Sequence, residues 1–460
     1  MNDAASATSP DGAATIAARM DRLPITPLHR RVTAVIGLGL FFDLYEVFLA
    51  GTLSATLKHK FNLDGTGLTL LLSSAFLGMF LGAIVIGRIS DRLGRRPAFL
   101  LSMSVYSVFT FAAAFSPNPA TLVALRFLAG TGIGAEPPVS DTYLGDMLPP
   151  RYRGRFTAWA YTLSFLAVPA AGFLGFYLVP RAPFGFDGWR WMFLFGALGA
   201  VIMFFARRGL PESPRWLASV GRHDEADAIV TGMEDAARER GLPLPPPVAT
   251  ASAADDERVG LRDLLRPALR GRTVMMVVMQ FFQTWGYYGF GTLVPIVLVG
   301  KGYDVVTSLG FLGVTYLGYP VGSLISLPII DRVERKYLIV ASVTLMAVFG
   351  VAFGFADGTA MILVLGFAYT AVSNIFSNAY HVYQAEVFPT RVRGTASSWA
   401  YSLSRLSSAL MPFILVPVLH HGGSGALFAV VAAAMAMVAL SVGLLGPRTT
   451  GRALGEVNAG

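Results

Sequence analysis

Cysteine is absent from the sequence. With no Cys among 460 residues, the chain can form neither a disulfide framework nor a thiolate metal site. The sequence also lacks a Walker-type Gly-x-x-x-x-Gly-Lys-Ser/Thr motif, which would bind nucleotide phosphates, and it has no His, Asp and Glu cluster at metal-ligand spacing. We therefore expect no enzyme activity, no metal and no cofactor.

Charged residues are scarce and long apolar runs are frequent. The charged fraction is 14%, whereas soluble domains have roughly 25%. Many apolar runs of about 18 to 25 residues are long enough to cross a bilayer core. These features predict an all-α polytopic membrane protein, with the lipid bilayer as a partner. The net charge of +8 does not indicate nucleic-acid binding, because the basic residues lie in loops where the positive-inside rule places them.

One pattern occurs twice along the chain. Residues 146–164 (DMLPPRYRGRFTAWAYTLS) align without a gap with residues 386–404 (EVFPTRVRGTASSWAYSLS), an offset of 240 positions. The same offset carries the charged loop at 91–96 onto 331–336. Two charged clusters that repeat in one register beside apolar segments indicate a duplicated membrane domain, which is a transporter architecture.

The apolar runs predict twelve transmembrane helices in two six-helix bundles related by pseudo-symmetry. Their approximate ranges are 32–57, 68–89, 97–116, 119–146, 155–179, 190–207, 272–299, 305–330, 337–356, 359–386, 394–419 and 424–446. The first residues are polar with no apolar core, so they do not form a signal peptide. The predicted organisation is a disordered cytosolic tail (1–30), a first bundle (31–208), a cytoplasmic linker with short helices (209–271), a second bundle (272–446) and a cytosolic tail (447–460).

Lys and Arg are concentrated in the loops of one predicted side of the membrane. The opposite side has only Lys58, Lys60, Arg181, Arg190 and Lys301. The positive-inside rule therefore places both termini and the central linker in the cytoplasm.

Several motifs resemble those of the major facilitator superfamily. The segment 87–96 (GRISDRLGRR) resembles its loop signature, and 126–134 (RFLAGTGIG) resembles its fourth-helix motif. The segment 211–217 (PESPRWL) is similar to that of the sugar-porter, organic-cation and synaptic-vesicle-like branches, while 135–138 and 386–394 resemble nicotinate-type and aromatic-acid porters. The resemblance covers residues 30 to 446 and implies a monomeric, multi-pass transporter of the bacterial inner membrane. In the second copy of the loop signature, Leu327 and Glu334 replace the two glycines.

Acidic and basic residues recur at the cytoplasmic helix ends in both halves. They either orient the helices or form Arg–carboxylate pairs that tie the helix ends together when this side is closed. The resemblance implies such a gate. Its predicted members are Gly87, Asp91, Arg92, Arg95, Asp146, Arg153, Glu212, Arg215, Asp331, Arg332, Arg335, Glu386 and Arg393.

Ionisable residues inside membrane spans are expensive, so they indicate function. The resemblance to proton-coupled sugar porters places Asp43 and Arg126 as an acid and a cation that exchange partners; a permanent bridge between them is the structural alternative. Glu46 competes with Asp43 as the proton carrier. Glu136 precedes Pro137 and Pro138 and either binds substrate, takes a proton or satisfies freed backbone groups. The other in-span ionisable residues are Asp141, His381 and Arg405.

The seventh span (MQFFQTWGYYGFG) and the tenth and eleventh spans contain aromatic and amide side chains. These either hydrogen-bond between helices or line a substrate site with aromatic walls. The predicted substrate-binding residues are Arg126, Gln280, Gln283, Trp285, Tyr287, Tyr288, Asn374, Asn378, Tyr401 and Arg405. Two Arg residues in such a cavity would attract a carboxylate. Arg405 replaces Phe165 of the repeat, which suggests a role that one half alone performs. The alternative is that Arg405 is a structural partner for Asp43 or Glu46.

These observations predict a secondary active transporter that works by alternating access. Its predicted activity is proton-coupled uptake of a small organic anion, an aromatic or heterocyclic carboxylate. The alternatives are a proton-coupled sugar or polyol porter, a drug or metabolite exporter, and a non-transporting sensor. Export is less favoured because residues 164–173 (SFLAVPAAGF) lack the Gly-rich run before Pro that exporters of this superfamily have.

Overall fold

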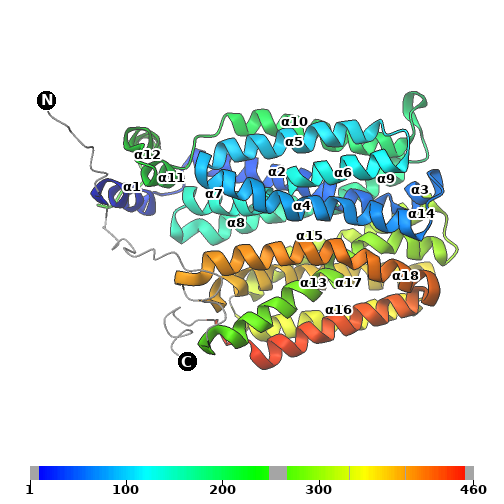
Figure 1. Ribbon diagram of the computed structural model, residues 1–460. Helices are drawn as coiled ribbons and strands as arrows, with labels where there is room; N and C mark the ends of the chain where they lie inside the picture. Colours follow the sequence, from blue (N-terminus) through cyan, green and yellow to red (C-terminus); the bar gives the residue numbers. More distant parts are fainter. Residues whose placement is uncertain (1–9, 248–266, 331, 389, 451–460) are drawn as a thin grey trace.

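The structure is a computed structural model, and it describes residues 10–247, 267–330, 332–388 and 390–450. Figure 1 shows two stacked sets of helices. The first set consists of α2 (Pro27–Thr52), α3 (Ser54–Lys60), α4 (Gly65–Leu93), α5 (Arg95–Ala114), α6 (Pro119–Ile133), α7 (Glu136–Met147), α8 (Pro150–Phe165), α9 (Ala167–Leu178) and α10 (Gly188–Arg208). The second set consists of α13 (Pro267–Gly300), α14 (Val305–Tyr316), α15 (Gly318–Ile329), α16 (Arg335–Phe355), α17 (Thr359–Val387) and α18 (Thr390–Leu445). The predicted all-α fold with two helical bundles is confirmed.

Several of these helices begin at a side chain that caps them. The carboxylate of Asp64 accepts from the Gly67 N–H (2.7 Å) at the start of α4, and Asp304 accepts from the Thr307 N–H (2.9 Å) at the start of α14. Asn118 does the same for α6, whose first residue is Pro119. Such caps satisfy N–H groups that have no partner within the helix, so the short loops set where the spans start.

Nine segments of the described chain are long and apolar enough to cross a membrane. They account for ten of the twelve predicted spans, because Trp399–Leu445 contains the last two, and the fourth and seventh spans are not among them. The fourth span is divided into α6 and α7 just before Pro137 and Pro138, which have no N–H to continue the helical hydrogen bonds. Helix α13 is long enough, but residues 280–288 make it too polar. Helix α18 contains the last two predicted spans, with a break at Gly423, whose φ is +70°.

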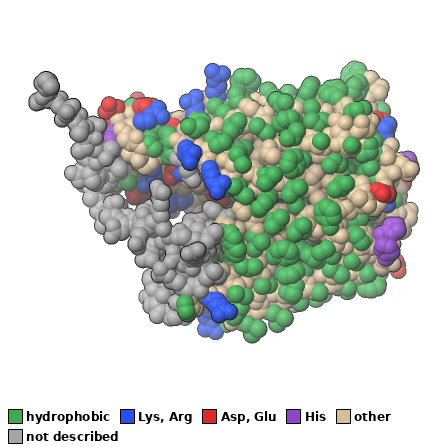
Figure 2. Space-filling model, in the orientation of Figure 1, with side chains coloured by type: hydrophobic (Ala, Val, Ile, Leu, Met, Phe, Trp, Pro, Cys, Tyr) green, Lys and Arg blue, Asp and Glu red, His purple; other side chains and the backbone are tan. Residues whose placement is uncertain are grey.

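Hydrophobic side chains cover the flank of the protein that Figure 2 shows. Over the described chain as a whole, the exposed hydrophobic side chains include Val108, Phe111, Leu198, Phe205 and Leu440, as expected for helices that face lipid. Lys and Arg gather toward the left end in Figure 2, where Figure 1 places α11 (Pro214–Ser219) and α12 (His223–Arg238). We call this the inner end, predicted to be cytoplasmic, and the opposite end, which holds α3, the outer end.

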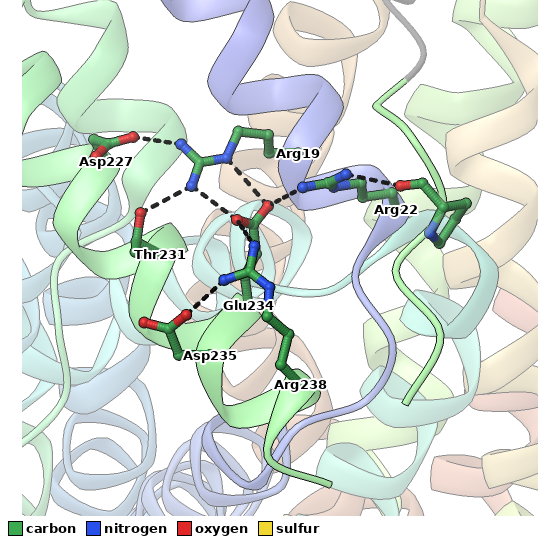
Figure 3. Close-up of polar contacts among 8 residues, drawn as sticks. Arg19, Arg22, Asp227, Thr231, Glu234, Asp235 and Arg238 are labelled. Atoms are coloured by element: carbon green, nitrogen blue, oxygen red, sulfur yellow. Dashed lines mark hydrogen bonds and ion pairs between the residues drawn. The ribbon is translucent and has the colours of Figure 1, made fainter. Parts of the chain in front are cut away.

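The N-terminal segment differs from its prediction. Residues 10–22 form α1 (Pro10–Arg22) and α2 already begins at Pro27, so the described part of the predicted disordered tail is helical; residues 1–9 lie outside the described chain. Figure 3 shows why α1 is fixed. Arg19 and Arg22 both contact the nearly buried Glu234 of α12, at 3.0 Å and 2.5 Å. The amphipathic pattern of α1 is short, and its partner lies 215 residues away, so local sequence gives no sign of the contact.

The described part of the linker contains two short helices. Helix α12 confirms the short surface helix expected within the linker, and α11 contains the PESPR motif. Burial opposes ionisation of Glu234, but hydrogen bonds from Arg19 and Arg22 outweigh it and hold the pKa of this carboxyl below its ordinary value. Helices α1, α11 and α12 therefore form a cap on the inner end of the first bundle.

Candidate substrate and proton-coupling sites

Two ion pairs are buried inside the first bundle. In the pair nearer the outer end, Arg126 Nη1 of α6 lies 3.2 Å from Glu46 Oε1 of α2, and both side chains are almost completely buried. The guanidinium also lies over the Phe193 ring, 5.6 Å from its centroid. The sequence had suggested Asp43 as the partner of Arg126. Glu46 takes this place because it lies nearly one turn farther toward the outer end of α2, at the depth of Arg126.

The pair nearer the inner end joins Glu136 of α7 to Arg207 of α10, each about 1% exposed. Arg207 lies over the Phe99 ring at 4.5 Å. Its guanidinium occupies the space beside Gly39, where a Cβ atom would lie 1.8 Å from Nη2. The sequence did not single out Arg207 as a functional residue. It is the penultimate residue of α10, where a basic residue is expected simply because it orients the helix in the membrane. Gly39, one turn before Asp43, is the sequence feature that could have indicated this contact. A glycine close to a buried acid leaves space for a large side chain from a neighbouring helix.

Asp43 lies close to the inner pair. Its side chain is 3% exposed, and neither carboxylate oxygen has a hydrogen-bond partner among the described residues. Glu136 and Arg207 are near enough to act on it electrostatically. The first bundle thus buries three carboxyl groups with two guanidinium groups. The cluster is electrically neutral when one of the three acids carries a proton, and Asp43 is the one without an ion-pair partner.

The second bundle holds one cation at a comparable depth, Arg405 of α18. Its Nη1 donates to the Tyr288 hydroxyl of α13 (2.9 Å) and its Nη2 to the Tyr401 hydroxyl (2.7 Å). The guanidinium also lies over both rings, at 5.4 Å and 4.6 Å. Its Nε–H has no hydrogen-bond partner within the described chain. Three predicted residues, Tyr288, Tyr401 and Arg405, therefore come together.

Residues of both bundles meet beside Arg405. In the first bundle, the Tyr161 hydroxyl donates to Asp141 Oδ1 (2.7 Å). The Tyr161 ring stacks on His381 of the second bundle at 6.0 Å, and His381 stacks on Tyr380 at 4.2 Å. Asp141 and His381 are exposed although both lie within predicted membrane spans, so side chains at this seam between the bundles are accessible. We call the set Asp141, Tyr161, Tyr288, His381, Tyr401 and Arg405 the central site.

The two bundles are in close contact on the outer side of the central site. The Phe48 ring of α2 packs against Tyr287, Tyr288, Tyr316 and Tyr319 of the second bundle, with centroids 5.6–6.3 Å apart. A Cβ atom on Gly172 of α9 would lie 2.6 Å from the Gly313 nitrogen of α14, so glycine is needed for this approach. We call these contacts the outer closure.

A pocket of about 720 Å³ lies between the bundles at the outer end. Its wall includes Lys58 and His59 from the first bundle and Lys301 and His420 from the second. Lys301 also donates to the carbonyls of Gly354 and Ala356, both at 2.9 Å. The pocket therefore places basic side chains at the mouth of the seam that the outer closure blocks.

Most of the predicted amide residues link helices of the second bundle. Gln280 donates to Gln384 and lies 3.5 Å from Gln283, while Trp285 Nε1 donates to Ser407 at 3.2 Å. Asn374 and Asn378 of α17 donate to the Tyr319 carbonyl (2.7 Å) and to Ser326 (2.6 Å) of α15. Tyr287 contacts Asn374 at 3.5 Å. Together with Arg126 in the first bundle, these residues lie outside the central site.

The predicted gate residues form networks at the inner end. In the first bundle, Arg95 Nε lies 3.6 Å from Asp146, and Glu212 accepts from the N–H groups of Arg95 and Arg96, both at 3.1 Å. Arg215 donates to the Asp146 carbonyl (3.1 Å) and pairs with Asp21 of α1 (2.6 Å).

In the second bundle, Arg335 Nε lies 3.4 Å from Glu386. Arg92 and Arg332 are exposed, and Arg153 reaches the Leu148 carbonyl at 3.5 Å. The side chains of Asp91, Asp331 and Arg393, and the surroundings of Gly87, lie outside the described part of the structure. The pair Arg95–Asp146 lies within the first bundle and the pair Arg335–Glu386 lies within the second, so in this conformation these two pairs each brace one bundle.

Comparison with known proteins agrees with this architecture. Residues 32–460 match the protein family described as "Sugar (and other) transporter". A putative metabolite transport protein of Bacillus subtilis is 32% identical, over 86% of this chain and 88% of that protein. A niacin transporter of Acinetobacter baylyi is 28% identical over 96% and 99% of the two chains, and a gentisate transporter of Corynebacterium glutamicum is 31% identical over 83% and 80%.

The fold is also that of a solved structure. The xylose transporter from E. coli, in a partially occluded inward-open conformation, superposes with a TM-score of 0.76 at 19% identity, over 92% of this chain and 99% of that one.

Proposed function

The chain belongs to the sugar (and other) transporter family of the major facilitator superfamily, and we propose that it takes up a small aromatic or heterocyclic carboxylate together with protons. The observation that carries this proposal is Arg405. A buried guanidinium is expensive in a membrane protein unless an anion accompanies it. The polar partners of Arg405 in the described chain are phenols, so a substrate carboxylate would supply the missing charge.

The surroundings of Arg405 favour an aromatic ring next to that carboxylate. Tyr161, Tyr288, Tyr380 and Tyr401 surround the exposed seam at this depth. A guanidinium has five N–H donors in a plane, and the phenols use two of them, which leaves donors for a forked contact to a carboxylate. The niacin and gentisate transporters among the relatives are named for aromatic carboxylates.

Proton coupling is proposed for the first bundle. Arg207 lies against Glu136 and close to Asp43, so it is placed to exchange one carboxylate for the other. While Arg207 is held by Glu136, Asp43 is a buried carboxyl without a partner, and its neutral, protonated form is the less costly one. When Arg207 turns to Asp43, the ionised form is stabilised and the proton leaves. Because three acids share two cations, one acid is protonated when the cluster is neutral. We therefore propose that one proton is carried in each cycle.

In an alternating-access cycle, the outer closure would open when the inner ends of the two bundles come together. In the conformation seen here the outer closure separates the central site from the outer pocket, and the inner-end pairs Arg95–Asp146 and Arg335–Glu386 each lie within one bundle. We infer that the inner-end networks re-pair between bundles when the outer closure opens. The outer closure packs through a few rings and glycines, so rigid-body rocking of the bundles can break it without unfolding a helix.

A sugar or polyol substrate is the second candidate, since the chain shares its family and fold with sugar transporters. The amides of α13 and α17, which would bind hydroxyl groups, are largely engaged by other protein groups. This engagement favours the carboxylate.

Uptake into vesicles tests the proposal. Purified full-length protein is reconstituted into liposomes, and uptake of radiolabelled nicotinate, 2,5-dihydroxybenzoate and xylose is measured with and without an imposed proton gradient. We expect accumulation of at least one of the two acids, driven by the gradient and abolished by a protonophore. Accumulation of xylose with no uptake of either acid would contradict the proposal.

A further inference from the structure

Asp141 is a charged group in the central site to which the proposed transport cycle assigns no part. It lies on α7 in the first bundle and is exposed within the predicted span 119–146, toward the inner end of that span. Oδ1 accepts from the Tyr161 hydroxyl (2.7 Å), and the structure gives Oδ2 no donor among the described residues. An ionisable side chain kept at this depth and open to the seam indicates a ligand-binding or ion-binding role.

Asp141 and Arg405 face the same phenols from opposite bundles. The Tyr401 hydroxyl accepts from Arg405, and the Asp141 carboxyl lies within electrostatic range of Tyr401 and Tyr380. Arg405 in turn lies within electrostatic range of Tyr380 and His381. The central site thus has a positive side formed by the second bundle and a negative side formed by the first, with aromatic rings between them.

The internal repeat shows that this polarity is a departure from symmetry. The 240-residue offset that relates Tyr161 to Tyr401 also relates Asp141 to His381 and Phe165 to Arg405. Tyr161 and Tyr401 therefore occupy equivalent positions in the two bundles, whereas the charged residues beside them differ. A site for a simple anion would need only the positive side, because a carboxylate on the other side repels the ligand.

We propose that Asp141 is a specificity-determining residue, which accepts a hydrogen bond from a hydroxyl or ring N–H on the side of the ring opposite the substrate carboxylate. This inference rests on the proposed function and narrows the substrate class to aromatic carboxylates that carry such a donor. The carboxylate lies against Arg405 in the second bundle, the ring lies between the tyrosines, and the donor reaches Oδ2 of Asp141 in the first bundle. A ligand of this kind contacts both bundles at once, whereas an acid without the donor contacts the charges of only one.

Binding of matched acids tests the inference. Isothermal titration calorimetry on the detergent-solubilised full-length protein compares benzoate with 3-hydroxybenzoate and 4-hydroxybenzoate, which differ from it by one hydroxyl. For the unmodified chain we expect the better hydroxybenzoate to bind about 10- to 100-fold more tightly than benzoate, since a hydrogen bond to a charged acceptor is lost in benzoate. Asp141→Ala should reduce this ratio to about twofold or less and should raise the affinity for benzoate, because the repelling charge is gone.

Two further variants separate specificity from structural effects. Asp141→Asn keeps an acceptor without the charge, so we expect an intermediate ratio. Thr142→Ala is the matched control: its hydroxyl is bound to the Pro138 carbonyl, and the ratio should match that of the unmodified chain. Thermal unfolding of each variant checks that it is folded.

The outcomes distinguish this inference from the proposed function. Equal affinity for benzoate and both hydroxybenzoates in the unmodified chain would overturn the inference and leave carboxylate transport intact. An unchanged ratio in Asp141→Ala, with loss of proton-driven accumulation in liposomes, would also overturn it, because Asp141 would then carry protons. If the unmodified chain binds none of the three acids and accumulates neither nicotinate nor 2,5-dihydroxybenzoate, both the inference and the proposed function fail.

Discussion

The two bundles share one fold and differ in where their charges are buried. The first holds Asp43, Glu46, Arg126, Glu136 and Arg207 inside its own core. At the positions 240 residues later, the first four of these are matched by Gln283, Gly286, Gly366 and Phe376, which are neutral. The second bundle places the buried Arg405 where the first has Phe165.

This difference suggests a division of labour between duplicated halves. Charges enclosed within one bundle can exchange protons without contacting a ligand, whereas a charge that faces the seam can bind a ligand that enters there. Duplication supplies the second copy of the scaffold, and single substitutions at equivalent positions then give the copies different chemistry. The predictions for Asp43, Arg207 and Arg405 test whether proton coupling belongs to the first bundle and carboxylate binding to the second, and the last two concern the cap outside both bundles.

The largest effect is expected for Asp43→Asn. Because an amide cannot carry the proton, proton-driven accumulation in liposomes should be abolished while exchange of pre-loaded substrate continues. Gln283→Ala, at the equivalent position of the second bundle, is the control and should leave the ratio of accumulation to exchange unchanged. Loss of both activities in Asp43→Asn would mean that Asp43 binds substrate or holds the fold, and the division of labour would be wrong.

Arg207→Gln should lower the free energy of unfolding by about 3–5 kcal/mol, because Glu136 is left as a buried carboxylate without its partner. Thermal unfolding in detergent measures this. Arg208→Gln changes the exposed neighbour and should have little effect.

Adding Glu136→Gln to Arg207→Gln should restore most of the stability, since no unpaired charge remains, but it should not restore proton-driven accumulation. Full coupling in the double variant would show that the inner pair is only structural.

Arg405→Lys should weaken carboxylate binding by about 1–3 kcal/mol, roughly 5- to 150-fold, since an ammonium group cannot make a forked contact. Calorimetry with 3- and 4-hydroxybenzoate measures the loss. The matched control is Arg448→Lys, because Arg448 also donates to a phenol (Tyr337, 2.7 Å) but lies at the exposed inner end. An unchanged affinity in Arg405→Lys would favour a neutral substrate.

The smallest effect is expected outside both bundles, at the contact of α1 with α12. Glu234→Gln should weaken the docking of α1 by about 1 kcal/mol, discounted because Arg19 and Arg22 are partly exposed to solvent. Hydrogen exchange of residues 15–22 measures the docking. Asp235→Asn removes only a contact with the exposed Arg238 and serves as control.

The docking of α1 should also depend on pH. The pKa of Glu234 is lowered in the folded state, so its contribution is complete above the ordinary carboxyl range and is lost as the pH falls through the folded-state pKa. Protection of α1 that stays constant from neutral pH down to about pH 3, below the ordinary Glu pKa of about 4.3, would contradict this.

Much of the architecture could be read from the sequence. Apolar runs locate the spans because a helix must be about 20 residues long to cross a bilayer, and the repeat at 146–164 and 386–404 shows the duplication without any structure. In-span charges are rare enough that Asp43, Glu46, Arg126, Glu136 and Arg405 could be selected one by one.

The partners of these charges depended on the tertiary structure. The axial depth of a side chain depends on the tilt and register of its helix, and pairing also depends on which helices are neighbours. Arg126 therefore pairs with Glu46, which lies nearly one turn from the expected partner Asp43. Arg207, at the inner end of α10, pairs with Glu136 because α10 and α7 place the two side chains at the same depth. The helical α1 shows the same limit, because its stability comes from a contact with a distant segment.

Composition and periodicity alone determined that this chain is a duplicated helical membrane protein, since the thickness and low polarity of a bilayer allow few other solutions. Only the tertiary structure decided that Asp43 lacks a partner while Asp141 and Arg405 face one seam. Pairing and exposure are set by distances between helices, and a linear sequence does not contain those distances.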